Sequence, residues 1–131
     1  MKVLIVEDDF VSRKMLQKII ASIGDSDVAI NGFEALEAFK FAKQERVPYD
    51  LVCLDIMMPD MTGIEVLTKI REIEAQDKDA DPMRCVKVIM TTALGDKGHI
   101  MSAFKGGCEA YIVKPIRPEQ LKDKIKELGL L

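Results

Sequence analysis

The sequence contains few residues that support redox or histidine chemistry. Its 131 residues include no tryptophan, one histidine and three cysteines, and no two cysteines are spaced as CxxC. Cys53, Cys85 and Cys108 are odd in number and far apart, which favours a reducing, cytoplasmic compartment. Cys53 lies inside an apolar run, where we expect a small buried hydrophobic residue. His99 stands in a polar segment, and we expect it at the surface.

Long apolar runs and an excess of basic residues are also missing. No stretch approaches the length of a transmembrane helix, and the N-terminus shows no signal-peptide pattern, so we expect no membrane association. The net charge of −3, without a basic tail, argues against direct binding to nucleic acid. The length fits one domain spanning residues 1–131, with no output domain.

Glycine-rich phosphate loops are absent as well. The chain has no GxxxxGK[ST] motif, which argues against a P-loop nucleotidase. Acids follow the first apolar run where a dinucleotide-binding protein or a flavodoxin would place its phosphate loop. An aspartyl-phosphate hydrolase would carry its nucleophile there, with a second Asp two residues later, and Glu7-Asp8-Asp9 does not supply that pattern.

Short apolar runs alternate with amphipathic segments along the chain. We expect strands at 2–6, 27–30, 51–55, 86–90 and 110–113, helices at 10–23, 33–46, 64–75, 97–105 and 118–128, and a polar loop at 76–82. Continuous aliphatic runs are typical of buried parallel strands, whereas apolar residues at three- and four-residue spacing indicate helices. The alternation predicts an α/β fold, with a doubly wound, five-stranded parallel sheet covered by helices on both faces.

Polar residues gather where the expected strands end. Acids follow the first and third strands, hydroxyls the fourth and a lysine the fifth: Glu7, Asp8, Asp9, Asp55, Thr91, Thr92 and Lys114. In an open parallel sheet these strand ends lie along one edge, and ligands bind there. Converging acids repel one another unless a cation binds, and Mg²⁺ suits a site made only of oxygen atoms. The edge is therefore suited to handling phosphate together with Mg²⁺.

Four motifs in order resemble one family. They are Val6-Glu7-Asp8-Asp9, Asp55-Ile-Met-Met-Pro59 followed by Gly63, Thr92-Ala93, and Tyr111-Ile-Val-Lys114-Pro115. Each motif alone is weak, but together they make the chain resemble the receiver domain of two-component response regulators, over essentially its whole length. The resemblance implies the flavodoxin-like strand order 2-1-3-4-5, which the residues alone do not predict. The layout is similar to that of stand-alone regulators of the chemotaxis type.

The resemblance implies a role for each motif residue. Asp55 would be the phosphoacceptor, whose carboxylate attacks a phosphoryl group and forms an acyl phosphate. Asp8, Asp55 and the backbone carbonyl of Met57 would bind Mg²⁺ directly, with Glu7 acting through a metal-bound water. Lys114 would supply a fixed cation and the Thr92 hydroxyl a hydrogen bond, because phosphoryl transfer needs mainly alignment and charge neutralisation. In the family the peptide between the lysine and the proline, here Lys114 and Pro115, is cis.

Two assignments within these motifs have alternatives. The acid pair is Glu7 and Asp8 when the family pattern is anchored on Val6, and Asp8 and Asp9 when it is anchored on an Asp-Asp-Phe match. We favour the first because it needs no gap. Thr92 precedes an alanine and lies 22 residues before Lys114, as in the family, whereas strand alternation turns Thr91 to the opposite face.

The resemblance also predicts partners and a switch. A sensor histidine kinase or a histidine phosphotransfer domain would donate the phosphoryl group. Movement of Thr92 would then let Tyr111 turn inward and change the face formed by the helix at 97–105, the strand at 110–113 and the last helix, which would bind a protein target. The alternative is a phosphorelay intermediate or phosphate sink. We expect a monomer, with dimerisation as the alternative, and no enzymatic activity beyond phosphorylation and dephosphorylation of the protein itself.

Two further positions bear on how long the phosphoryl group would last. In the family, the residues two after the acceptor and two after the hydroxyl residue flank the site, and here both are apolar, Met57 and Leu94. The rapidly decaying chemotaxis regulator has polar side chains there that can hold water. The resemblance therefore predicts slower decay for this chain.

Overall fold

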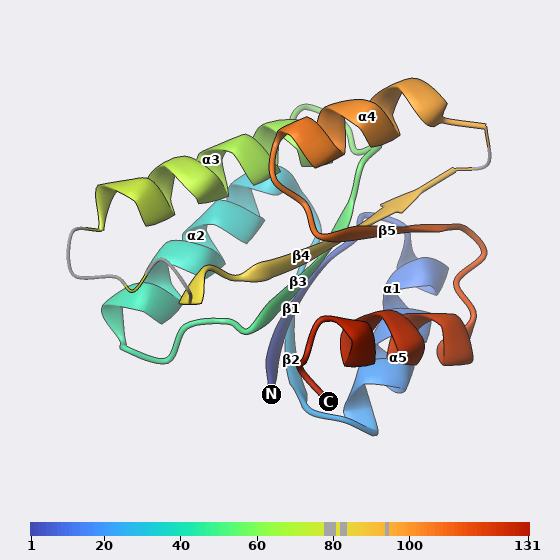
Figure 1. The fold of residues 1–131 in the computed structure, drawn as a ribbon, viewed down its shortest axis with the longest axis horizontal. Coiled ribbons are helices and arrows are strands. Elements are labelled where there is room, and N and C mark those ends of the chain that lie inside the picture. Colours follow the sequence, from blue (N-terminus) through green and yellow to red (C-terminus); the bar gives the residue numbers. More distant parts are fainter. Residues whose placement is uncertain (78–80, 82–83, 94) are drawn as a thin grey trace.

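The computed structural model describes residues 1–77, 81, 84–93 and 95–131. They form five strands and five helices: β1 (Lys2–Val6), α1 (Phe10–Ala21), β2 (Asp25–Ala29), α2 (Gly32–Gln44), β3 (Leu51–Asp55), α3 (Gly63–Gln76), β4 (Lys87–Thr92), α4 (Lys97–Lys105), β5 (Ala110–Val113) and α5 (Pro118–Glu127). All strands are parallel, in the order β2-β1-β3-β4-β5 (Figure 1). The α/β fold and the strand order expected from the resemblance are confirmed. None of the described helices is long and apolar enough to cross a membrane.

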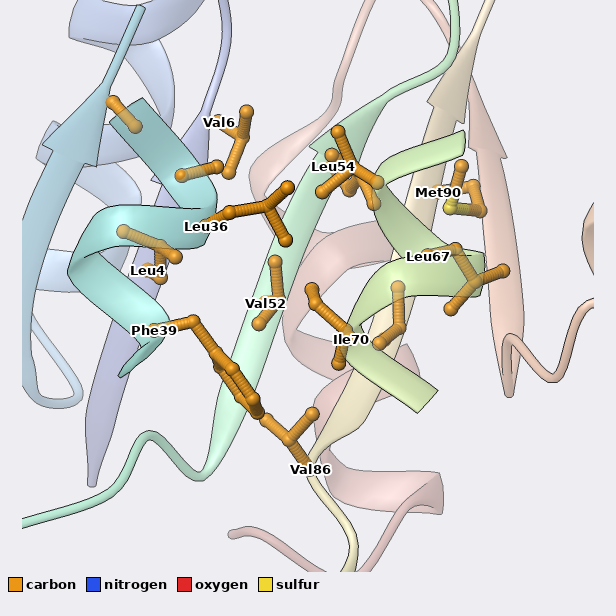
Figure 2. Packing of buried hydrophobic residues seen from close by; sticks show 14 of the residues in the cluster. Leu4, Val6, Leu36, Phe39, Val52, Leu54, Leu67, Ile70, Val86 and Met90 are labelled. Atoms are coloured by element: carbon orange, nitrogen blue, oxygen red, sulfur yellow. The ribbon is translucent and has the colours of Figure 1, made fainter. Parts of the chain in front are cut away.

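The sheet separates two apolar layers. Helices α2, α3 and α4 cover one face, and α1 and α5 cover the other (Figure 1). On the first face Leu36 and Phe39 of α2 and Ile70 of α3 pack against alternate residues of the strands, such as Val52 (Figure 2). Because residues i and i+2 of a strand share a face, the apolar strands β1, β3, β4 and β5 fill both layers, and their polar residues lie at the strand ends.

Several element boundaries differ from the prediction. β2 covers Asp25–Ala29 instead of 27–30, because its five residues pair one for one with β1, from Lys2 with Asp25 to Val6 with Ala29. β4 extends to Thr92 because Thr91 pairs with Asp55 of β3 and Thr92 with Val113 of β5. The polar loop expected at 76–82 lies mostly outside the described residues.

Charged groups at the sheet edge opposite the predicted site are paired. Arg71 of α3 donates two hydrogen bonds to the Gly107 carbonyl and one to the Val86 carbonyl, and it forms ion pairs with Glu74 (2.7 Å) and Glu109 (3.1 Å). The two glutamates in turn accept backbone N–H groups at the start of β4. This network joins α3, β4 and the segment before β5 through one arginine that contacts both glutamates.

Candidate functional site

The predicted polar residues meet at the carboxyl edge of the sheet. Glu7 follows β1, Asp55 ends β3, Thr92 ends β4 and Lys114 follows β5. The loop after β3 folds back tightly, since the Gly63 N–H donates to the Ile56 carbonyl at 2.8 Å. A Cβ on Gly63 would lie 2.1 Å from the Asp55 carbonyl oxygen, so only glycine fits there. This close approach holds the start of α3 against the backbone of Asp55.

Three carboxylates form a cluster. Glu7, Asp8 and Asp55 each bring one oxygen within 4.8 Å of the others. Glu7 is fully buried and Asp55 is 4% exposed, whereas Asp8 is exposed. Asp9 does not join them, because its side chain caps α1 by accepting the Ser12 N–H at 2.9 Å. The structure thus brings together the acid pair that the first alignment predicts, and the third acid has a separate role in helix capping.

Lys114 lies on the other side of the acids. Its Nζ is 2.6 Å from Glu7 Oε1 and 3.4 Å from Asp55 Oδ2. Burial alone would lower the pKa of Lys114, but the hydrogen bonds and charges of Glu7 and Asp55 outweigh burial and raise the pKa. The Lys114–Pro115 peptide is cis. Lys114 is therefore a cation at neutral pH that contacts both buried carboxyl groups.

Asp55 carries the strongest electrostatic perturbation of the site. The pKa of Asp55 is raised from 3.8 to about 8, first by burial and then by the neighbouring Glu7 carboxyl group, while Lys114 opposes the shift. One lysine therefore does not balance the two buried carboxyl groups. The backbone N–H of Met57 donates to Asp55 Oδ1 at 3.3 Å. The loop after β3 therefore also supplies a hydrogen-bond donor to this carboxylate.

Among the residues that the structure describes, one buried carboxylate oxygen of the cluster has no hydrogen-bond partner. Oε1 of Glu7 has the ion pair with Lys114, whereas the buried Oε2 receives no hydrogen bond from any described residue. Buried carboxylate oxygens are normally satisfied, so an orphaned oxygen beside two further acids indicates a missing positive partner. The donors are all hard oxygen atoms, as Mg²⁺ requires, and these residues fit that ion. The buried Thr91 hydroxyl also lacks a hydrogen-bond partner within the described part of the chain.

Tyr111 lies in β5 and Thr92 ends β4, and the hydrogen-bond acceptors of the Thr92 hydroxyl lie outside the Glu7, Asp8 and Asp55 cluster. The Thr92 hydroxyl is buried, and its single proton has two acceptors, the Ala93 carbonyl and Asp96 Oδ2, both at 3.4 Å. Tyr111 is 36% exposed and its ring meets Phe104 edge to face, with centroids 5.7 Å apart. Sequence reasoning missed Asp96, because an acid at a helix start indicates a helix cap and not a contact with the preceding strand.

Comparison with known proteins decides the family. The response regulator receiver domain model matches residues 3–126. The chain belongs to this family. The receiver is 35% identical over 127 residues to the chemotaxis protein CheY of Listeria monocytogenes, covering 97% of each chain. It is also 33% identical to hybrid signal transduction histidine kinase I of Dictyostelium discoideum, where it spans only 7% of that protein.

A solved structure of a CheY protein has the same fold. The receiver superposes on a chain of the CheX–CheY–BeF₃–Mg²⁺ complex of Borrelia burgdorferi with a TM-score of 0.82 and 30% identity, over 100% of this chain and 90% of that one. The fold is therefore that of CheY-like receivers. Receiver domains of this family bind Mg²⁺ through an acidic pocket, and the cluster at Glu7, Asp8 and Asp55 is such a pocket by its composition.

Proposed function

We propose that this receiver accepts a phosphoryl group on Asp55. One Asp55 oxygen attacks phosphorus, the bond to the donor breaks, and an acyl phosphate forms. The supporting observation is the position of Asp55, buried at the end of β3 with Lys114 Nζ 3.4 Å away and two further acids beside it. Labelling of the wild type but not of Asp55→Asn by a small phosphoryl donor tests the assignment.

Glu7, Asp8, Asp55 and the Met57 carbonyl would hold Mg²⁺ in this reaction. The bound ion supplies positive charge to the phosphoryl oxygens, which phosphoryl transfer requires. Lys114 provides a second positive charge from the β5 side, and its contacts with Glu7 and Asp55 keep the ammonium group aimed at the site. The Met57 N–H already points at Asp55 and can donate to the phosphoryl group once the acyl phosphate forms.

The output surface is proposed to be the face of α4, β5 and α5. Tyr111 and Phe104 line a groove of about 350 Å³ there, together with Gln120 and Lys124 of α5. When the Thr92 hydroxyl turns to the phosphoryl group, space opens beneath β4 and Tyr111 can leave its half-exposed position. A protein target that recognises this face would then bind the phosphorylated form with a different affinity.

Addition of beryllofluoride with Mg²⁺ is expected to change the amide chemical shifts of Tyr111 and Phe104, as well as those of the acid pocket. The reason is that this mimic of the phosphoryl group would attract Thr92 and so repack the groove. Two-dimensional NMR spectra with and without the mimic measure the effect, and Asp55→Asn, treated identically, is the control. Changes confined to residues around Asp55 would contradict a switch through this face.

The phosphoryl donor is proposed to be a sensor histidine kinase or a histidine phosphotransfer domain. An apolar groove of about 460 Å³ lies next to Lys114, between α1 and the β5–α5 loop, and is lined by Val11, Met15, Pro115 and Ile116 among others. Val11 is 66% exposed and Met15 40% exposed. A donor domain seated on this apolar surface could bring its phosphohistidine to the carboxyl edge of the sheet. We also propose that residues 1–131 form one receiver domain, that the protein is a monomer and that its location is cytoplasmic.

The phosphorylated wild type is expected to lose its phosphoryl group slowly. The phosphorylated double variant Met57→Asn with Leu94→Glu is expected to lose it about tenfold faster than the wild type. Met57 is 54% exposed beside the acceptor, so its apolar side chain disfavours an ordered attacking water. Leu94 lies outside the described residues, and its part rests on the family resemblance. Decay of radiolabelled protein measures the rate. Met101→Asn, at an exposed methionine on α4, is the matched control. Equal decay of the double variant and the wild type would contradict control by these flanking residues.

A further inference from the structure

The acid at the start of α4 does not cap its helix. Asp96 occupies the N-cap position, but its side chain makes no capping hydrogen bond and its backbone lies at φ −88° and ψ 59°. The N-cap side chains of the three helices α1, α2 and α3 behave differently, since Asp9, Asn31 and Thr62 each accept the N–H group three residues later. The Asp96 carboxylate is therefore available for another role.

That carboxylate joins the switch threonine to the only histidine of the sequence. Asp96 Oδ2 accepts the Thr92 hydroxyl at 3.4 Å, and Asp96 Oδ1 contacts His99 Nδ1. The Asp96 side chain is 18% exposed and Thr92 is fully buried, so water competes little for the hydroxyl. The Ala93 carbonyl is a second acceptor at 3.4 Å, but a carboxylate oxygen is a stronger acceptor than a carbonyl oxygen. Both acceptors of the hydroxyl in the resting protein therefore belong to the segment that leads into α4.

We propose that Asp96 is a positioning residue that holds Thr92 in its resting orientation. The inference rests on the proposed function, in which the Thr92 hydroxyl turns to the phosphoryl group on Asp55. That turn breaks the bond to Asp96, so Asp96 stabilises the resting state and weakens the binding of anything that requires the active one. His99 holds the other carboxylate oxygen and keeps Asp96 facing Thr92.

Asp96→Ala is expected to bind beryllofluoride, in the presence of Mg²⁺, about three- to tenfold more tightly than the wild type, measured by titration calorimetry. Asp96→Asn keeps an oxygen acceptor without the charge, so its gain should be smaller. His99→Ala removes the contact to Asp96 Oδ1 but keeps the carboxylate, and it should also raise the affinity for beryllofluoride. Asn31→Ala removes a true helix cap and serves as the control, with lower stability but unchanged affinity.

The proposed effect of Asp96 on the affinity for beryllofluoride depends on the Thr92 hydroxyl. In a Thr92→Val background, Asp96→Ala is expected to change the affinity for beryllofluoride by less than about twofold, because no hydroxyl remains to be released. An equal gain in both backgrounds, or no gain in the wild-type background, would overturn the proposal. If the wild type binds no beryllofluoride at all, the proposed function itself fails, and the two failures are thereby distinguished.

A second measurement does not depend on phosphoryl binding. In the resting protein, three-bond couplings should report a single Thr92 rotamer for the wild type and averaged rotamers for Asp96→Ala. A single unchanged rotamer in both proteins would overturn the positioning role, whatever the affinities are.

Discussion

Acetyl phosphate with Mg²⁺ is expected to add one phosphoryl group to the wild type and none to Asp55→Asn. The amide of asparagine cannot act as the nucleophile. Among the described residues of the cluster, Asp55 is the acid that ends β3, and the other two acids follow β1. Glu7 is fully buried and in contact with Lys114, and Asp8 is exposed at the rim of the cluster. Intact-mass spectrometry of both proteins under identical conditions measures the difference, which should amount to complete loss of labelling.

Two further variants make this result specific. Asp123→Asn changes an exposed acid on α5 and should be labelled as fully as the wild type. Asp8→Asn keeps the acceptor but removes one acid of the cluster, so labelling should become slower and need more Mg²⁺. Equal labelling of the wild type and Asp55→Asn would refute Asp55 as the acceptor.

Much of the fold follows from local patterns in the sequence. The run from Leu51 to Asp55 forms a strand with the predicted bounds, because a wholly apolar strand bounded by turn residues and a carboxylate has few alternative structures. The meeting of Glu7, Asp55 and Lys114 follows from topology alone, since parallel strands end at a common edge. Strand order needs the family resemblance, because no local pattern specifies which strands are neighbours.

Other features depend on contacts that local patterns do not encode. β2 lies at the sheet edge and carries Asp25 and Asp27, so its strand character comes from pairing with β1 and not from its own side chains. Ile30 is as hydrophobic as a strand residue, but it lies beyond the last pair and is 47% exposed. The bond from Thr92 to Asp96 depends on how the loop before α4 turns, which the spacing of the two residues does not determine.

Without Mg²⁺, the free energy of unfolding of the wild type is expected to fall relative to that of Asp55→Asn as pH rises from about 4 to about 8. The folded protein raises the pKa of Asp55 from 3.8 to about 8, first through burial and then through Glu7. Between these values the folded state binds a proton that the unfolded state has lost, so raising the pH favours unfolding. The asparagine side chain of the variant has no proton to lose and does not contribute to this pH dependence.

Asp55→Asn should therefore be more stable than the wild type at pH 8 by about 1–3 kcal/mol, and the difference should shrink toward pH 4. We expect less than the full pKa shift implies, because the exposed Asp8 side of the cluster admits water that screens the charges. Mg²⁺ should reverse the order at pH 8, since it binds the ionised acids of the wild type and stabilises the folded state by mass action. Urea unfolding at pH 5 and pH 8, with EDTA or with Mg²⁺, measures all four differences. A stability difference that is independent of both pH and Mg²⁺ would show that burial and Glu7 do not destabilise the ionised Asp55 carboxyl and that the cluster does not bind the ion.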